Sequence, residues 1–507
     1  MNIIRTIALF CLSVSTVQAK DISSIEIDHI VENAMEVFSV PGISVGVIQN
    51  GKVTHAKGYG VRSLNDGGAV DEHTYFGIAS NSKGFTATAL AILVDEGKIA
   101  WDDKVKDYLP EFRLWDPHIT ENFTIRDLLA HATGLPLGSG DLMWWPDANY
   151  SPDEVIRNMR HLKPNRGIRT TYEYNNLPFV VAGAIIPAVT GKNYQDFLQE
   201  RIFDPLDMDR CTANTPNMAT DGNLAESHAV LEGNLKQIKR YLILDRVVGS
   251  MAAAGIQCSV DDLLKWELMH ISGGKGLMKA ETHASLWQVN TPFNISESQR
   301  KNGTNFAGYG LGYTLSDYHG NRVVGHGGAL IGMYSNLTMV PELGFGVVIT
   351  TNQQSSAAHA FIKDEILNNI LDIDNKSTAR QRFENGERKR LKEVERLSAL
   401  KGNGKLQRYP GGYVGLYSDP WWQDVEISQK DGSLYFTSSR SPALRGRMEH
   451  FEADTFIVRW DDRTHEADAF VEFQSTNDGP INGFTMKAVS IRTDFSYDFH
   501  HVNMVKR

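Results

Sequence analysis

The stretch GIASNSKGFTATALAIL, residues 77–93, places a serine and a lysine three positions apart where a turn gives way to an apolar run. The pattern S-x-x-K occurs four times in the chain, beginning at Ser80, Ser272, Ser298 and Ser398. The pattern alone therefore does not select a reaction centre. Only the match at Ser80 leads into a long apolar segment, residues 85–94, which predicts a helix buried in a core.

The spacing of Ser80 and Lys83 suits nucleophilic catalysis. Positions i and i+3 share one face of a helix, so the amine would stand one turn from the hydroxyl. A serine becomes a good nucleophile when a neighbouring base removes its proton, and a buried lysine can be that base because burial lowers its pKa. The alternative is structural: Ser80 caps the helix and Lys83 extends to water.

Length and composition limit the class of protein. The chain has 507 residues, which predicts two or three domains, and 41% hydrophobic with 22% charged residues is typical of a globular protein. The formal net charge is −10, and no basic stripe interleaved with aromatic residues occurs. We therefore expect no nucleic-acid partner.

Residues 1–19, MNIIRTIALFCLSVSTVQA, have the layout of a signal peptide: Arg5 near the start, an apolar run, and small residues before a cleavage point after Ala19. The apolar run is too short to span a bilayer comfortably. This predicts a periplasmic or secreted protein with no transmembrane segment in the mature chain. A buried N-terminal helix is the alternative.

Cysteine and metal-binding patterns are sparse. After cleavage only Cys211 and Cys258 remain, so at most one disulfide can form within the mature chain. No C-x-x-C, H-E-x-x-H or phosphate-loop glycine pattern occurs. We expect no metal and no cofactor.

The pattern of residues 20–375 predicts an α+β domain. A helix over 25–38 precedes a β-hairpin centred on Asn50-Gly51, and residues 80–300 are mostly helical in pattern. Four strands over 308–317, 321–328, 334–342 and 345–352 then precede a helix over 357–373. Strands at both ends with helices between them predict one antiparallel sheet, flanked by helices, with an inserted helical region.

The C-terminal part differs in pattern. Residues 376–405 are rich in charge and predict a linker or a surface helix. Residues 406–507 alternate in polarity with frequent turns, which predicts a separate all-β barrel or sandwich. Its aromatic residues could face a ligand, but filling the core of a small barrel is the favoured interpretation for Tyr413, Tyr417, Trp421 and Trp422.

Two further patterns accompany Ser80-x-x-Lys83. Tyr174-Asn175-Asn176 precedes another apolar helix, and His326-Gly327-Gly328 lies on a predicted strand. In this order the three patterns resemble those of the serine β-lactamases of the class C type, together with the related penicillin-binding D,D-peptidases and esterases. The resemblance covers roughly residues 25–373, and the C-terminal module is similar to the β-rich, lipocalin-like domains that some members carry.

The resemblance implies a role for each residue. Ser80 would be the acylated nucleophile, Lys83 its base or proton relay, and Tyr174 the group that passes the proton to the leaving group and helps to activate water. Whether Lys83 or Tyr174 is the general base stays open. Asn176 would bind the substrate amide or orient Lys83.

The third pattern implies the remaining contacts. His326 would add a proton-linked electrostatic contact, and the glycines beside it, Gly328 included, would let a substrate backbone approach. The N–H groups of Ser80 and Ala329 would form the oxyanion hole. A second Y-x-N, Tyr334-Ser335-Asn336, follows this strand instead of preceding it, and we interpret it as structural.

His-Gly-Gly in place of Lys-Thr-Gly removes a permanent charge that would hold a carboxylate. This shifts the expected function from efficient antibiotic hydrolysis to a peptidase, amidase or esterase acting on a small molecule or peptide. The alternative is a catalytically weak protein that binds cell-wall peptides or assembles with itself, and a homo-oligomer could form through the C-terminal domain. Residues 143–146, MWWP, either line the substrate cleft or pack as a surface loop.

Overall fold

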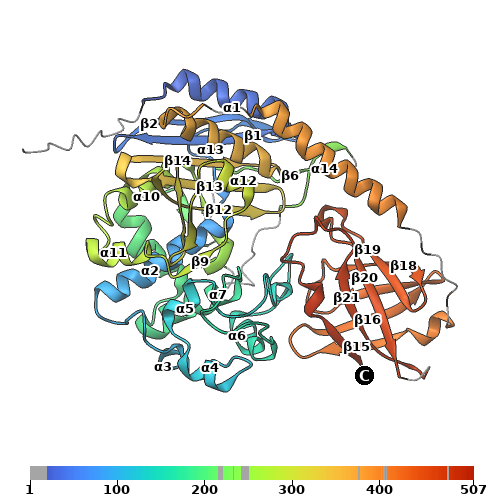
Figure 1. Ribbon diagram of the computed structural model, residues 1–507. Coiled ribbons are helices and arrows are strands. Elements are labelled where there is room, and N and C mark those ends of the chain that lie inside the picture. The colour runs from blue at the N-terminus through green and yellow to red at the C-terminus, as the bar shows by residue number, and fades with distance from the viewer. Residues whose placement is uncertain are drawn as a thin grey trace, which may run out of the picture.

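The computed structural model describes residues 20–214, 221–231, 233–240, 251–374, 377–400, 402, 406, 408–476 and 479–507 (Figure 1). The signal segment predicted over residues 1–19 lies outside these residues. A large antiparallel sheet with its helices forms one body, and a β-barrel lies beside it (Figure 1). In the part of the chain described here, no helix has the length and apolar character needed to cross a bilayer.

The large sheet combines strands from distant parts of the sequence. Its strands are β1 (Gly42–Gln49), β2 (Lys52–Ser63), β3 (Gly67–Ala69), β9 (Thr291–Phe293), β10 (Ala307–Tyr309), β11 (Thr314–Tyr318), β12 (Asn321–Leu330), β13 (Met333–Val340) and β14 (Phe345–Thr351). They are ordered β3-β2-β1-β14-β13-β12-β11-β10-β9. Because β1 pairs with β14, Ile43 lies opposite Thr351 and the two ends of the predicted domain meet in the middle of the sheet.

The hairpin between β1 and β2 turns at the predicted dipeptide. Asn50 and Gly51 both have positive φ, 52° and 71°, as a two-residue hairpin turn requires. The strand expected over residues 308–317 is instead two strands, β10 and β11. Gly312, with φ 83°, breaks the extended run, so the chain reverses and the two strands pair with each other.

Helices cover both faces of this sheet. On one face lie α1 (Ser24–Phe38) and α13 (Ser356–Ile370), and the long α14 (Ala379–Ala399) packs against these two helices, at the top of Figure 1. On the other face α10 (Val260–Ile271) packs so closely that a Cβ at Gly46 would lie 2.7 Å from Leu264. All eight residues of β1 are buried, because both faces are covered.

The inserted region is helical, as expected. Its central helix α2 (Ser82–Asp95) is buried at every position from 82 to 93 and packs against α7 (Leu177–Thr190). The other α-helices among its described residues are α3 (Val105–Tyr108), α4 (Pro117–Asn122), α5 (Ile125–Leu129), α6 (Pro152–Asn158), α8 (Tyr194–Leu198), α11 (Ala280–Leu286) and α12 (Glu297–Lys301). A π-helical turn, Met251–Gly255, packs against α2 and α7.

A small sheet adjoins this region. Its strands are β4 (Phe76–Gly77), β5 (Cys211–Thr212) and β8 (Gln257–Cys258), and a separate hairpin consists of β6 (His228–Leu231) and β7 (Asn234–Gln237). Cys211 and Cys258 are paired across β5 and β8 and form a disulfide. The disulfide lies next to β4, which leads directly into Ser80.

The C-terminal module is a closed barrel. Its strands are β15 (Gly415–Asp419), β16 (Gln423–Lys430), β17 (Ser433–Ser438), β18 (Arg445–Glu452), β19 (Thr455–Trp460), β20 (Ala469–Ser475), β21 (Ile481–Ala488) and β22 (Asn503–Lys506). Each strand pairs with the next, and β22 pairs with β15. Inside the barrel or against the helical region lie the buried aromatic residues Tyr413, Tyr417, Trp421 and Trp422.

The predicted fold is therefore confirmed: a mixed α/β, β-lactamase-like body with an antiparallel sheet, followed by a β-barrel. The barrel contacts the body through buried and partly buried groups. The Tyr150 hydroxyl donates to the carbonyl oxygen of Trp422 at 2.6 Å, and Arg440 makes a bidentate ion pair with Glu154. One hydrophobic core runs through both parts without interruption.

Candidate active site

Ser80 lies in a single 3-10 turn, Ala79–Asn81, directly before α2. Its side chain is partly exposed, whereas Lys83, one helical turn further on, is completely buried. Ala79 has a positive φ of 49°, an uncommon conformation for a residue with a side chain that often marks a functional turn. The sharp turn leaves the hydroxyl at the surface while α2 continues into the core.

Lys83 is held by three acceptors. Its Nζ donates to Asn176 Oδ1 at 2.7 Å and to the carbonyl oxygen of Ala253 at 2.9 Å, and lies 3.1 Å from Ser80 Oγ. Burial lowers the pKa of Lys83 from 10.5 to about 7, although the charge of Asp141 acts in the opposite direction. Near neutral pH a large share of this amine is therefore unprotonated.

Tyr174 stands on the other side of the hydroxyl. Its phenol shares a hydrogen bond with Ser80, and the Nζ of Lys83 lies 4.9 Å from its ring centre. Burial raises the pKa of Tyr174 well above 10, so the phenol keeps its proton at neutral pH. Lys83 and Tyr174 thus converge on Ser80, the former able to lose a proton and the latter not.

The segment that carries Tyr174 is fixed by its neighbours. The amide of Gly138 donates to the carbonyl oxygen of Tyr174 at 2.9 Å, and the Asn175 side chain donates to the carbonyl oxygen of Ser139 at 3.0 Å. The amide of Asn175 donates to His131 Nδ1 at 3.2 Å. The His131 ring lies behind Tyr174, with 4.2 Å between ring centres.

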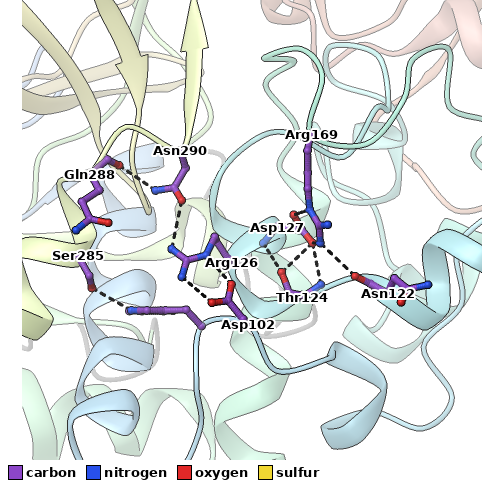
Figure 2. Close-up of polar contacts among 10 residues, drawn as sticks. Asp102, Asn122, Thr124, Arg126, Asp127, Arg169, Ser285, Gln288 and Asn290 are labelled. Carbon is purple, nitrogen blue, oxygen red and sulfur yellow. Dashed lines mark hydrogen bonds and ion pairs between the residues drawn. The ribbon is translucent and has the colours of Figure 1, made fainter.

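An ion-pair network anchors the same segment at its start (Figure 2). Arg169 makes two hydrogen bonds to the buried carboxylate of Asp127, at 2.7 and 2.6 Å, and Asp127 caps α5 together with Thr124. On the other side of α5, Arg126 donates to Asp102 and to Asn290 (Figure 2). The network joins α5, which leads into His131, to the chain that leads into Tyr174.

Asn176 connects Lys83 to a buried acid. Its Oδ1 accepts from Lys83, while its Nδ2 donates to Asp141 Oδ2 at 2.7 Å. Asp141 also accepts from Trp144 Nε1 at 3.0 Å and from the Ser496 hydroxyl at 3.0 Å. Burial raises the pKa of Asp141 to about 7, although these three hydrogen bonds act to lower it. Amine and acid therefore titrate in the same pH range and are coupled.

Strand β12 brings its glycines against the turn that bears Ser80. A Cβ at Gly328 would lie 2.2 Å from the carbonyl oxygen of Ile78, so only glycine allows this approach. Ser335, opposite Gly328 on β13, donates to the same oxygen at 2.7 Å and accepts from Asn81 at 2.8 Å. The middle residue of the second Y-x-N thus supports the turn, and Ala329 is the next residue along β12.

His326 is a buried imidazole on the strand beside Ser80. Burial, together with the charge of Lys83, lowers its pKa from 6.5 to about 3, so the ring is neutral at physiological pH. Its Nδ1 lies 2.6 Å from the carbonyl oxygen of Gly327 and must carry the hydrogen, so Nε2 accepts from the Tyr309 hydroxyl at 2.9 Å. The imidazole acts as a fixed hydrogen-bonding group beside Tyr174, with 6.1 Å between the ring centres.

The aromatic cluster 143–146 is buried rather than a loop on the surface. The indole of Trp144 bonds Asp141, while Trp145 lines a cavity of about 420 Å³ between the sheet and the barrel. Ala329 and Tyr334 form the sheet side of this cavity, and Arg492 lies on its barrel side.

The structure gathers Ser80, Lys83, Tyr174 and Asn176 in one cluster, with His326, Gly328 and Ala329 along the adjacent strand. Sequence reasoning missed the residues behind them: Asp141, His131, Tyr309 and Ser496. Asp141 could have been noticed as an acid in the glycine-rich run LGSGD before the tryptophans. Nothing near Ser496 in sequence relates it to a site 355 positions earlier.

Comparison with known proteins bears on the family and the fold. The model of the family described as Beta-lactamase matches residues 27–370, and a domain of unknown function, DUF3471, matches residues 411–506. Among solved structures, the octameric penicillin-binding protein homologue from Pyrococcus abyssi has a TM-score of 0.63 at 20% identity, covering 96% of this chain and 100% of that one. At that identity the likeness concerns the fold alone.

Curated relatives are more similar in sequence. Unguisins hydrolase ungD' of Aspergillus campestris is 28% identical over 66% of this chain and 62% of its own length, so this chain spans about three fifths of that protein. Unguisins hydrolase ungD of Aspergillus violaceofuscus is 26% identical over 84% of this chain and 81% of its own length. Protein flp of Staphylococcus aureus strain MW2 is 26% identical over 65% and 63%. The family model spans well over half of the chain, and the protein therefore belongs to the β-lactamase family, whose members are typically serine hydrolases.

Proposed function

We propose that the protein is an exported serine hydrolase that cleaves amide or ester bonds through an acyl-serine intermediate. One observation carries the proposal: a buried amine with a pKa of about 7 lies 3.1 Å from the hydroxyl of Ser80, which is partly exposed. Burying a lysine this deeply costs stability, and catalysis is the usual reason for such a pKa beside a nucleophile.

In the proposed mechanism Lys83 is the general base. When its amine is neutral, two hydrogens point to Asn176 Oδ1 and the carbonyl oxygen of Ala253, which leaves the lone pair for the hydroxyl of Ser80. Ser80 Oγ attacks the substrate carbonyl as its proton passes to Lys83. The N–H groups of Ser80 and Ala329 stabilise the oxyanion.

Tyr174 then transfers a proton to the leaving group as the bond to it breaks, and regains one from Lys83. Its high pKa makes it a proton relay rather than the base. A water molecule attacks the acyl-serine, its proton passes to the same groups, and the acid product leaves with Ser80 restored. No step requires a metal or a cofactor.

For the substrate we propose D-amino-acid peptides, related amides or small esters. The neutral His326 supports this, because the strand beside Ser80 then lacks the fixed positive charge that would hold a β-lactam carboxylate. The names of two relatives, unguisins hydrolases, support hydrolysis as the reaction class. Export through residues 1–19 is part of the same proposal.

Covalent labelling tests the proposal. The protein is incubated with a fluorophosphonate and, separately, with a fluorescent penicillin, and the labelled peptide is identified by mass. We expect label on Ser80, lost in Ser80→Ala. A panel of D-Ala-containing peptides, p-nitrophenyl esters and nitrocefin then defines the preferred substrate.

The alternative is a catalytically weak binding or scaffold protein. Absence of label on wild type, with no turnover of any substrate in the panel, would refute the hydrolase and favour that alternative. Label on a different serine would refute the assignment of the nucleophile. Penicillin labelling without turnover would indicate a binding protein that acylates and does not release.

A further inference from the structure

The connection between β21 and β22 of the barrel, residues 489–502, reaches the candidate site. A Cβ at Gly138 would lie 2.6 Å from the carbonyl oxygen of Phe495, and the Phe495 ring meets the Tyr174 ring at right angles, with 5.7 Å between their centres. Asp498, which is completely buried, accepts a hydrogen bond from the amide of Gly140 at 2.6 Å. This connection therefore packs directly on the chain that holds Tyr174 and Asp141.

One residue of the connection joins the chain of hydrogen bonds behind the nucleophile. The hydroxyl of Ser496, which is 5% exposed, donates to Asp141 Oδ2 at 3.0 Å. The same oxygen accepts from Asn176, whose other end holds Lys83. A path of three hydrogen bonds thus runs from the barrel through Asp141 and Asn176 to Lys83.

The hydrogen bond from Ser496 affects the pKa values of both Asp141 and Lys83. A donated hydrogen bond stabilises the charged form of a buried carboxyl, so Ser496 lowers the pKa of Asp141. A charged Asp141 in turn raises the pKa of Lys83. Loss of the Ser496 hydroxyl should therefore make Asp141 harder to ionise and Lys83 easier to deprotonate.

Other titratable groups face the same pair. Asp498 adds a negative charge near Asp141. Around Lys83 stand Tyr174 and the neutral rings of His131 and His326. Asp494 of the same connection faces Tyr174 and accepts a hydrogen bond from the amide of Ser496 at 2.9 Å. None of these groups donates a hydrogen bond to Asp141, whereas Ser496 does.

We propose that the β21–β22 connection is a working part of the catalytic site, in which Ser496 of the barrel positions the Asp141 carboxyl that holds Asn176 against Lys83. This gives the C-terminal domain a role in the reaction of the body and rests on the proposed function. Ser496 is a positioning residue: it acts through Asp141 and does not touch the substrate.

The test compares Ser496→Ala with wild type in the full chain. We expect kcat/KM on an ester substrate to fall about 10-fold, mainly in kcat, as is typical when a hydrogen bond to a charged group is lost. The acid limb of the pH profile should move to lower pH, because Lys83 then loses its proton more readily. Ser496→Thr, which keeps the hydroxyl, should restore both.

Two comparisons isolate the path. Ser418→Ala removes a similar bond from a serine to an aspartate, Asp424, elsewhere in the barrel, and should leave kcat and the pH profile unchanged. In an Asp141→Asn background, Ser496→Ala should have little further effect, since residues acting through one network are not additive. Equal effects of Ser496→Ala with and without Asp141→Asn would overturn the proposal.

A measurement without substrate separates the two proposals. The stability difference between wild type and Ser496→Ala should grow as pH rises above about 7, the pKa of Asp141 in the wild type, because only an ionised Asp141 gains fully from the bond. If Ser80 is never labelled but this growth is observed, the hydrolase proposal fails while the link from the barrel to Asp141 holds. If Ser80 is labelled and neither the pH profile nor this difference responds, the hydrolase stands and the inference fails.

Discussion

Replacing Lys83 by methionine should abolish acylation of Ser80 and at the same time remove a pH-dependent cost to stability. Methionine fills nearly the same volume without a charge. Lys83 is completely buried, and its pKa is lowered from 10.5 to about 7, chiefly by loss of solvent. Lys83, which the proposed chemistry requires, should therefore lower the stability of the folded state at low pH, where its buried amine is charged.

The size of this effect follows from the pKa difference. A base whose pKa is lower in the folded than in the unfolded state releases a proton on folding, so stability rises with pH between the two values, about 7 and 10.5. The whole difference corresponds to about 5 kcal/mol. About 2–3 kcal/mol of it falls between about pH 8 and about pH 10, where Asp141 is largely ionised.

The quantity to measure is the difference in free energy of unfolding between Lys83→Met and wild type, as a function of pH. Methionine leaves Asn176 Oδ1 and the carbonyl oxygen of Ala253 without their donor, which costs about 1–3 kcal/mol each and offsets part of the gain. This cost hardly varies with pH. The stability of Lys83→Met relative to wild type should therefore fall by about 2–3 kcal/mol between about pH 8 and about pH 10.

Urea denaturation followed by tryptophan fluorescence at a series of pH values measures this difference. Lys301→Met is the matched control, because the Lys301 side chain is 72% exposed and the same substitution there removes a charge from the surface instead of from the core. A difference between Lys83→Met and wild type that stays constant from about pH 8 to about pH 10 would refute the argument that Lys83 is held partly neutral.

Three further outcomes are expected. Gly328→Ala should lower kcat by about 100-fold or more, because its Cβ would lie 2.2 Å from the carbonyl oxygen of Ile78 and displace Ala329. Gly327→Ala should keep most activity, because its Cβ meets nothing closer than 4.0 Å. Steady-state kinetics of both variants measure the difference, and equal losses of kcat would contradict the geometry. Burial raises the pKa of Glu267 well above 4.5, so the folded state keeps a proton that the unfolded state loses. The free energy of unfolding should therefore fall as pH rises above 4.5. Denaturation curves of Glu267→Gln should lack this fall, and a parallel fall in the variant would exclude Glu267 as the source of the pH dependence. Reducing the disulfide between Cys211 and Cys258, 47 positions apart, should lower the free energy of unfolding by up to about 4 kcal/mol. Denaturation with and without reductant measures this loss, and no change would mean that the thiols are already reduced in the protein tested.

Much of the fold could be read from local patterns. Asn50-Gly51 fixed the first hairpin, because both residues accept the positive φ that the turn requires. The apolar run after Ser80 predicted a fully buried helix, and alternation in residues 406–507 predicted the second β-domain. The division of 308–317 into β10 and β11 was missed, because glycine patterns do not show whether a strand continues or reverses.

The candidate site was predictable where its geometry is local. Ser80 and Lys83 meet because the 3-10 turn that holds Ser80 runs directly into α2, so positions three apart still share one face, as the spacing predicts. Tyr174, Asn176 and His326 were identified through a family resemblance, since no local rule brings residues so far apart together. The pKa of His326 could not be predicted from the sequence, because it depends on burial and on Lys83 rather than on neighbours in sequence.

The sequence by itself determined the order of the motifs, the position of Ser80 and Lys83 at the start of a buried helix, and the two kinds of domain. Only the tertiary structure decided which groups lie behind Lys83, including a serine of the barrel 355 positions away from the acid it contacts. The physical reason is that hydrogen-bond patterns within helices and hairpins are set by neighbouring residues. The pKa of a buried group, in contrast, is set by whatever surrounds it in space, wherever in the chain those atoms originate.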